Sequence, residues 1–93
     1  MGDKMIHVDG NKGKKITLYS LSNNVWSNEA KRVLGEAGVE YDYLDVDLLQ
    51  GDDKIKADEN VRALNPGYSF PIIIVDGRTF IGFDENKIKA MIK

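Results

Sequence analysis

The sequence predicts an α/β fold in which a four-stranded mixed sheet is flanked by helices. Segments typical of strands alternate with amphipathic segments typical of helices, in the order β-α-β-α-β-β-α. The apolar run Ile72–Val75 is long enough for a buried central strand, and the Asp76-Gly77 pair after it is typical of a two-residue hairpin turn. A helical crossover makes two strands parallel, whereas a hairpin makes them antiparallel, so the sheet should be mixed.

Each element has its own signal. Strands are expected at residues 16–19, 41–46, 72–75 and 78–81, and helices at residues 27–37, 52–64 and 85–92. The first helix carries apolar residues at helical spacing: Ala30, Val33, Leu34 and Ala37. The second carries a further apolar set: Ile55, Ala57, Val61 and Leu64. Gly38 should end the first helix in a left-handed conformation, and Asn65-Pro66-Gly67 should end the second.

The chain is short and nearly neutral. Its 93 residues suffice for one domain, expected at residues 15–93, and its net charge of -2 argues against a nucleic-acid-binding protein. Residues 1–14 are expected to form either a flexible leader or an extra strand at residues 6–8. No apolar stretch is long enough to span a membrane, and residues 1–15 lack the apolar centre of a secretory signal. We therefore expect a cytoplasmic protein, and a monomer.

Cysteine is absent from the chain. This absence excludes disulfides, thiolate metal sites and thiol nucleophiles. The only histidine, His7, lies in the N-terminal segment, so the sequence places no base beside a serine. Alternation along the second strand puts Asp42 on the opposite face from Asp45 and Asp47. These carboxylates should therefore not converge, and we expect solvated charges and no metal site.

Over residues 15–93 the chain resembles the glutaredoxins. Leu18-Tyr19-Ser20 is followed by a loop and by Asn24-Val25-Trp26-Ser27, where that family has its Cys-x-x-Cys motif before a helix. Gly38-Val39-Glu40-Tyr41 leads into Asp45-Val46-Asp47, which is similar to the second strand of the family.

Two further segments carry the resemblance. Tyr68-Ser69-Phe70-Pro71 resembles the Thr-Val-Pro segment of the family with its cis proline, and Ile81-Gly82-Phe83-Asp84 resembles its Gly-Gly-x-Asp turn. The resemblance implies the thioredoxin fold and glutathione-dependent thiol–disulfide oxidoreductase activity. It implies no cofactor beyond glutathione as a cosubstrate, with glutathione or disulfide-containing proteins as partners.

Asn24 and Ser27 occupy the positions that the resemblance assigns to the two cysteines. In the family, the first cysteine lies at a helix start, where free N–H groups and the helix dipole stabilise its thiolate, and the second closes a disulfide with it. Neither an amide nor an unactivated hydroxyl can form a disulfide, so a site with Asn24 and Ser27 at these positions is redox-inactive. Both residues are instead expected to cap the helix. A natural loss and an engineered replacement of the cysteines both stay open.

The resemblance assigns substrate binding to six residues: Trp26, Phe70, Pro71, Gly82, Phe83 and Asp84. The backbone of Phe70 would pair with the cysteine of glutathione, and residues 82–84 would hold its γ-glutamyl end. Three of these residues have a structural alternative, namely surface packing for Trp26, a strand start for Pro71 and a helix cap for Asp84.

One residue departs from the family pattern at this site. Many glutaredoxins carry a lysine three residues before the first cysteine, where this chain has Leu21. Leucine supplies neither charge nor donor, which weakens the case for glutathione affinity. The alternative function is a redox-silent binding module for glutathione or a partner protein.

Overall fold

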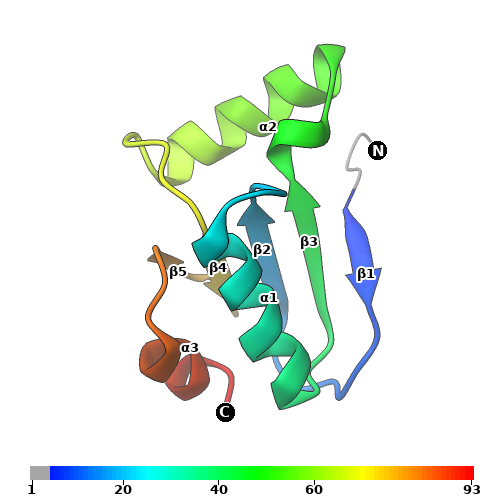
Figure 1. Ribbon diagram of the computed structural model, residues 1–93, viewed down its shortest axis with the longest axis vertical. Helices are drawn as coiled ribbons and strands as arrows, with labels where there is room; N and C mark the ends of the chain where they lie inside the picture. Colours follow the sequence, from blue (N-terminus) through cyan, green and yellow to red (C-terminus); the bar gives the residue numbers. More distant parts are fainter. Residues whose placement is uncertain (1–4) are drawn as a thin grey trace.

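The computed structural model describes residues 5–93 and shows a five-stranded mixed sheet with helices packed against it (Figure 1). The strands are β1 (Ile6–Val8), β2 (Ile16–Ser20), β3 (Tyr41–Asp45), β4 (Ile72–Val75) and β5 (Arg78–Ile81). The helices are α1 (Val25–Ala37), α2 (Gly51–Leu64) and α3 (Glu85–Met91), with a short 3₁₀ turn, η1 (Val46–Leu48), before α2. The predicted α/β fold class is therefore confirmed.

The strands lie in the order β1-β3-β2-β4-β5. β2 runs parallel to β3, with Ser20 opposite Asp45 at the end of the pair. β4 runs antiparallel to both β2 and β5, and the hairpin between β4 and β5 turns at Asp76 and Gly77, as predicted. Because β2 and β3 are parallel neighbours, their carboxyl ends meet at one edge of the sheet, where the loop to α1 begins.

Two apolar clusters cover the two faces of the sheet. Ile72 and Ile73 belong to different clusters because successive side chains of a strand point to opposite faces. The cluster of Ile73 includes buried residues of α1 and α3: Ala30, Val33, Leu34 and Ile88. The cluster of Ile72 includes buried residues of α2: Ala57 and Val61. Helices α1 and α3 therefore cover one face, and α2 covers the other.

β1 makes the sheet one strand larger than the four that the sequence predicts. It pairs antiparallel with β3, and His7 lies opposite Asp42. Of the two alternatives for residues 1–14, the structure has the strand at Ile6–Val8, while residues 1–4 lie outside the described part of the chain. Three residues carry too little periodicity to decide between these alternatives or to predict the partner strand.

Three details of the helices differ from the prediction. Ala37, expected on the buried face of α1, is exposed, because it lies in the last turn of the helix. α1 begins at Val25 rather than Ser27, because Asn24 is its cap. Ile55 is 57% exposed, so its predicted place on the buried face of α2 is wrong. The cause is spacing, since Ile55 and Ala57 are two residues apart and face opposite sides of a helix. Among residues 5–93, every helix falls short of the length and apolarity that a bilayer span requires.

Candidate functional site

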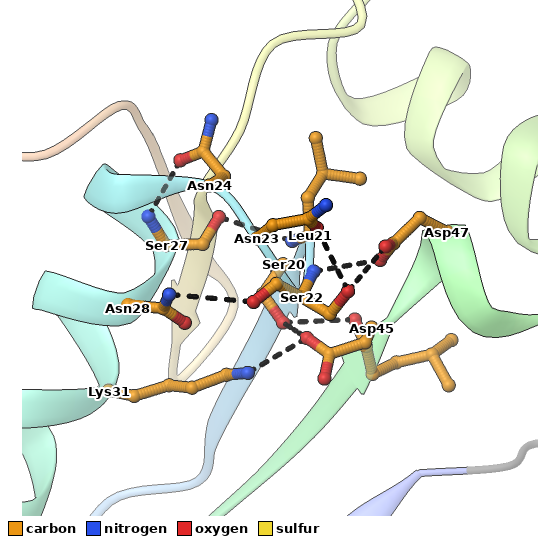
Figure 2. Close-up of polar contacts among 11 residues, drawn as sticks. Ser20, Leu21, Ser22, Asn23, Asn24, Ser27, Asn28, Lys31, Asp45 and Asp47 are labelled. Atoms are coloured by element: carbon orange, nitrogen blue, oxygen red, sulfur yellow. Dashed lines mark hydrogen bonds and ion pairs between the residues drawn. The ribbon is translucent and has the colours of Figure 1, made fainter.

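The loop after β2 presents Asn24 at the first turn of α1 (Figure 2). Asn24 Oδ1 accepts the backbone N–H of Ser27 at 2.8 Å, and the Asn24 carbonyl accepts the N–H of Asn28 at 3.0 Å. These bonds satisfy donors that the start of a helix otherwise leaves without a partner. Asn24 therefore caps α1, as predicted, and it does so at the position where a reactive cysteine would lie.

Ser27 lies inside α1 rather than at its cap, so its predicted capping role is wrong. Its side chain is buried, and its Oγ accepts the backbone N–H of Leu21 at 3.2 Å. No histidine or carboxylate is among its hydrogen-bond partners in residues 5–93. His7 lies on β1, which β3 separates from β2. A buried hydroxyl without a base is not activated as a nucleophile.

Asp45 ties the end of β3 to β2 and α1 directly beneath this loop (Figure 2). Its Oδ1 accepts from Lys31 Nζ at 2.8 Å and from Ser20 Oγ at 2.5 Å. The side chains of Asp45 and Lys31 are only 11% and 22% exposed, so the ion pair is largely removed from water. The prediction that Asp45 is a solvated strand-end charge is therefore wrong.

Asp47 anchors the loop itself. It accepts the backbone N–H of Ser22 at 2.8 Å and also the Ser22 hydroxyl. Burial alone would raise the pKa of Asp47, but the hydrogen bonds from Ser22, helped by the charge of Lys31, lower that pKa below its ordinary value. The carboxylate thus stays ionised and keeps the loop attached to η1. Asp42 lies away from this group, beside His7, as the alternation predicts.

An aromatic groove lies beside the first turn of α1. It has a volume of about 170 Å³ and is lined by four residues: Trp26, Phe70, Gly82 and Phe83. Trp26 is 56% exposed and stacks on Phe83, with ring centroids 5.7 Å apart. The N–H of Gly82 donates to the Pro71 carbonyl at 2.7 Å, which joins the two segments that form the wall. The fold thus brings together five of the predicted binding residues, all except Asp84.

The Phe70 backbone is open. Phe70 and Pro71 are joined by a cis peptide bond, and the Pro71 side chain is buried. Within residues 5–93, no hydrogen bond involves the backbone N–H or the carbonyl of Phe70. Unpaired backbone groups next to a groove are suited to pairing with an extended ligand, which then lies like an added strand.

Tyr68, in the loop after α2, supports this segment. Its ring meets the Phe70 ring edge to face, with centroids 5.1 Å apart. The Tyr68 hydroxyl donates to Asp58, which also accepts from Lys54 at 2.9 Å. These two hydrogen bonds lower the pKa of Asp58. This support is not predictable from the sequence, because Tyr68 has a left-handed backbone, φ 54°, that no sequence pattern indicates.

Asp84 lies at the rim, after Gly82. Its Oδ1 accepts the backbone N–H of Lys87 at 3.2 Å and caps α3, which is the structural alternative that the sequence suggested. Its second carboxylate oxygen makes no hydrogen bond within residues 5–93, and the residue is exposed. Gly82 has φ 97°, a conformation that favours glycine, and it turns the chain from β5 towards this cap.

The polar residues that hold the loop were not among the predicted site residues: Ser20, Ser22 and Lys31. A signal for one of them was present, because Ser20 ends a strand beside the end of the parallel strand that carries Asp45. Lys31 carried no such signal, since its partner depends on the rotation of α1 over the sheet.

The fold and the site together define a class. A mixed sheet with helices on both faces, and a helix that begins beside a cis-proline segment, make this a protein of the thioredoxin-like α/β fold. The family model for glutaredoxin matches residues 16–81. The chain therefore belongs to the glutaredoxin family.

Solved structures and a curated relative agree with this assignment. The glutaredoxin from Methanosarcina mazei Go1 is 38% identical, with a TM-score of 0.82, over 95% of this chain and 86% of that one. The methanoredoxin of Methanosarcina acetivorans is 36% identical, with a TM-score of 0.78, over 89% of this chain and 97% of that one. An 8.6 kDa glutaredoxin-like protein from the rubredoxin operon of Clostridium pasteurianum is 28% identical over 84% of this chain and 97% of its own length.

Proposed function

We propose that this chain is a redox-inactive glutaredoxin-type module. It binds glutathione, or an extended segment of a partner protein, in the groove beside Trp26 and Phe70, and it exchanges no disulfide. One observation carries this proposal. The groove and the open Phe70 backbone are present, whereas the two positions that would hold sulfur are filled by side chains engaged within the fold.

The chemistry of Asn24 and Ser27 supports inactivity. Thiol–disulfide exchange requires a thiolate that attacks a disulfide sulfur, and the chain contains no cysteine. The Asn24 carboxamide is committed to the N–H of Ser27, and the Ser27 hydroxyl is buried against Leu21. Neither group can replace a thiolate, because neither forms a bond to sulfur that a second thiol could break.

The groove supports binding. An extended peptide would pair with the N–H and carbonyl of Phe70 and would lie against the stacked rings of Trp26 and Phe83. The second oxygen of Asp84 is available to accept a hydrogen bond from the ammonium group of a γ-glutamyl end. Glutathione presents both of these features, an extended backbone and a terminal ammonium group.

Leu21 limits the expected affinity for glutathione. It packs with the α2-side apolar cluster and offers no charge to the glycyl carboxylate. We therefore expect a dissociation constant on the order of 1 mM for glutathione. A longer peptide of a partner protein would pair with the same Phe70 groups and would depend less on a terminal carboxylate. A cytoplasmic location and a monomeric state stay predictions from the sequence.

The binding proposal is tested by titrating reduced glutathione, and separately an extended cysteine-containing peptide, into the ¹⁵N-labelled protein. We expect amide shifts at Phe70, Gly82 and Phe83, and a several-fold weaker response in Trp26→Ala. Ile55→Ala is the matched control, because Ile55 is similarly exposed (57%) but lies on α2. Binding at the groove is contradicted if neither ligand shifts these amides, or if Trp26→Ala and Ile55→Ala behave alike.

The redox proposal is tested separately with a glutathione mixed-disulfide reduction assay. The protein as it stands should show no turnover above the uncatalysed rate. The double variant Asn24→Cys/Ser27→Cys should gain activity, because Asn24 occupies the helix-capping position where the dipole lowers a thiol pKa. Turnover by the cysteine-free chain would contradict the proposal. A folded double variant without activity would contradict descent of this site from an oxidoreductase.

A further inference from the structure

His7, the only histidine of the chain, stands among carboxylates at the outer edge of the sheet. Its Nδ1 lies 2.6 Å from Asp42 Oδ1. Its Nε2 lies 2.7 Å from Glu40 Oε2 and 3.1 Å from Asp9 Oδ1. His7, Asp9 and Glu40 each offer one ligand atom, and these atoms lie within 4.8 Å of one another. The two ring nitrogens therefore have different partners.

The antiparallel pairing of β1 and β3 creates this cluster. His7 lies opposite Asp42, and Val8 opposite Tyr41, which is the last pair of the ladder. Asp9 directly follows β1 and Glu40 directly precedes β3, so both residues flank this last pair. The contacts of the His7 ring with Asp42, Glu40 and Asp9 bring the four side chains together.

The turn after Asp9 is fixed by backbone contacts. The Asn11 N–H donates to the Gly38 carbonyl at 2.7 Å, and the Glu40 N–H donates to the Asn11 carbonyl at 3.0 Å. Gly10 passes so close to this segment that a Cβ there would lie 2.6 Å from the carbonyl carbon of Val39. Only glycine fits at that distance. The positions of Asp9 and Glu40 relative to each other are therefore set by backbone, although the Asp9 side chain itself is 98% exposed.

We propose that His7 Nε2, Asp9 and Glu40 form a binding site for a divalent transition-metal ion such as Zn²⁺, with Asp42 as the residue that positions His7. Imidazole nitrogen and carboxylate oxygen are common zinc ligands, and three protein ligands leave a fourth position for water. Zinc bonds of about 2.0–2.1 Å in a tetrahedron place ligand atoms roughly 3.3 Å apart. The observed separations of 2.7 and 3.1 Å from Nε2 need only small side-chain movements to reach that value.

Asp42 gives the cluster the arrangement that metal-binding histidines usually have. A histidine that binds a metal through one nitrogen normally donates the N–H of the other to a carboxylate, which fixes the tautomer and the ring orientation. Here the 2.6 Å contact with Asp42 holds Nδ1 and turns Nε2 towards Asp9 and Glu40. This proposal departs from the expectation of no metal site, and it involves two residues, His7 and Asp9, that precede the residues 16–81 matched by the family model.

A proton is the natural competitor for this site. The hydrogen bond to Asp42, with the charges of Asp42, Glu40 and Asp9, raises the pKa of His7 above its usual 6.5. Below that pKa the imidazolium interacts with all three carboxylates, and a metal ion must displace a proton from Nε2. Zinc affinity should therefore increase as the pH rises through the pKa of His7. Calcium should bind more weakly than zinc, since it prefers ligand sets made only of oxygen.

The test is a titration of ZnCl₂ into the chelator-treated full chain, followed by calorimetry and by ¹⁵N NMR of the imidazole ring. The ring signals are unambiguous, because the chain has one histidine. We expect one zinc ion per chain and a large shift of the Nε2 resonance. His7→Gln and Glu40→Gln should each weaken binding by more than about tenfold, and Asp42→Asn by about tenfold with a change in the Nδ1–H/Nε2–H tautomer ratio. Asp52→Asn, an exposed carboxylate on α2, is the matched control and should leave the affinity unchanged.

Equal zinc affinity in the parent and in His7→Gln would overturn the proposal, because the ion would then be held by carboxylates or by the N-terminal residues. The absence of a ring response at a zinc concentration on the order of 1 mM would overturn it as well. Unchanged tautomer populations in Asp42→Asn would remove the positioning role of Asp42. Circular dichroism of each variant establishes that the sheet is intact.

Discussion

Acidic side chains have opposite surroundings near the two ends of β3. Near its carboxyl end, each carboxylate has donors of its own: Lys31 and Ser20 for Asp45, and Ser22 for Asp47, which lies in η1. At its amino end, three carboxylates share one imidazole, that of His7. Carboxylates matched by donors hold a structure together, whereas an excess of carboxylates around one base attracts a proton or a cation.

The matched carboxylates explain why the loop before α1 keeps its shape without sulfur. Asp47 holds Ser22, Asp45 holds Ser20 and Lys31, and Asn24 and Ser27 hydrogen-bond within the first turn and loop (Figure 2). The interactions that hold the loop therefore involve no residue at the groove surface. Substitutions in this network should change stability, and substitutions in the groove should change binding.

The largest effect is expected for Asp45→Ala. It removes the carboxylate partner of a Lys31 side chain that is 22% exposed, and it also removes the nearer of two acceptors of the Ser20 hydroxyl, which keeps only the Leu44 carbonyl at 3.3 Å. Because a partly buried ammonium loses its carboxylate and a buried hydroxyl keeps only the longer of its hydrogen bonds, we expect a loss of about 2–3 kcal/mol in the free energy of unfolding. Urea unfolding measures it. Asp52→Ala, which removes an exposed carboxylate, is the control. A similar loss in the free energy of unfolding in both variants would show that the donors of Asp45 do not make it more important for stability than an exposed carboxylate.

A smaller loss is expected for Ser27→Ala. The substitution leaves the Leu21 N–H, which now donates to Ser27 Oγ at 3.2 Å, without an acceptor. An unsatisfied, partly buried backbone donor costs about 1–2 kcal/mol. Ser69→Ala removes an exposed hydroxyl that makes no hydrogen bond within residues 5–93 and should be neutral. Equal stability of Ser27→Ala and the parent would show that the loop does not depend on this bond.

Removal of the helix cap should lower the free energy of unfolding by less than Ser27→Ala does. Asn24→Ala deletes the acceptor of the Ser27 N–H, and we expect a loss of about 1 kcal/mol in urea unfolding. Asn24→Asp keeps the acceptor and adds a negative charge at the helix start, so it should retain the stability of the parent. Asn60→Ala, an exposed position within α2, controls for the change in helix propensity. If Asn24→Asp were as unstable as Asn24→Ala, the cap would not be the cause.

The elements were predictable where a periodic pattern runs for several residues. The apolar run of β4, the hairpin at Asp76-Gly77 and three of the four apolar positions of α1, all but Ala37, were predicted and observed. The three residues of β1 gave no such pattern, and their partner is set by the turn at Gly10 rather than by apolar spacing.

The groove residues were predictable from the resemblance, but the side chains that hold the loop were not. Trp26, Phe70 and Phe83 come from three separate segments, and only motifs matched in order indicate that they meet. The contacts of Lys31 with Asp45 and of His7 with Glu40 depend on how elements are rotated and registered against one another. The rotation and register of elements relative to one another are tertiary properties, and the residue spacing within a single element does not predict them.

The smallest effect is expected at the amino end of β3, and it depends on pH. The pKa of His7 is raised in the folded state, so its ion pairs with Asp9, Glu40 and Asp42 stabilise the fold fully below about pH 6.5 and lose that contribution as the pH rises through the folded-state pKa. His7→Gln lacks this contribution at every pH. With a chelator present, the melting temperature of the parent should therefore exceed that of His7→Gln near pH 6 and approach it near about pH 9. A difference in melting temperature that stays constant over this range would show that His7 does not gain or lose a proton there. The excess of carboxylates at the amino end of β3 would then not be compensated by protonation of the imidazole.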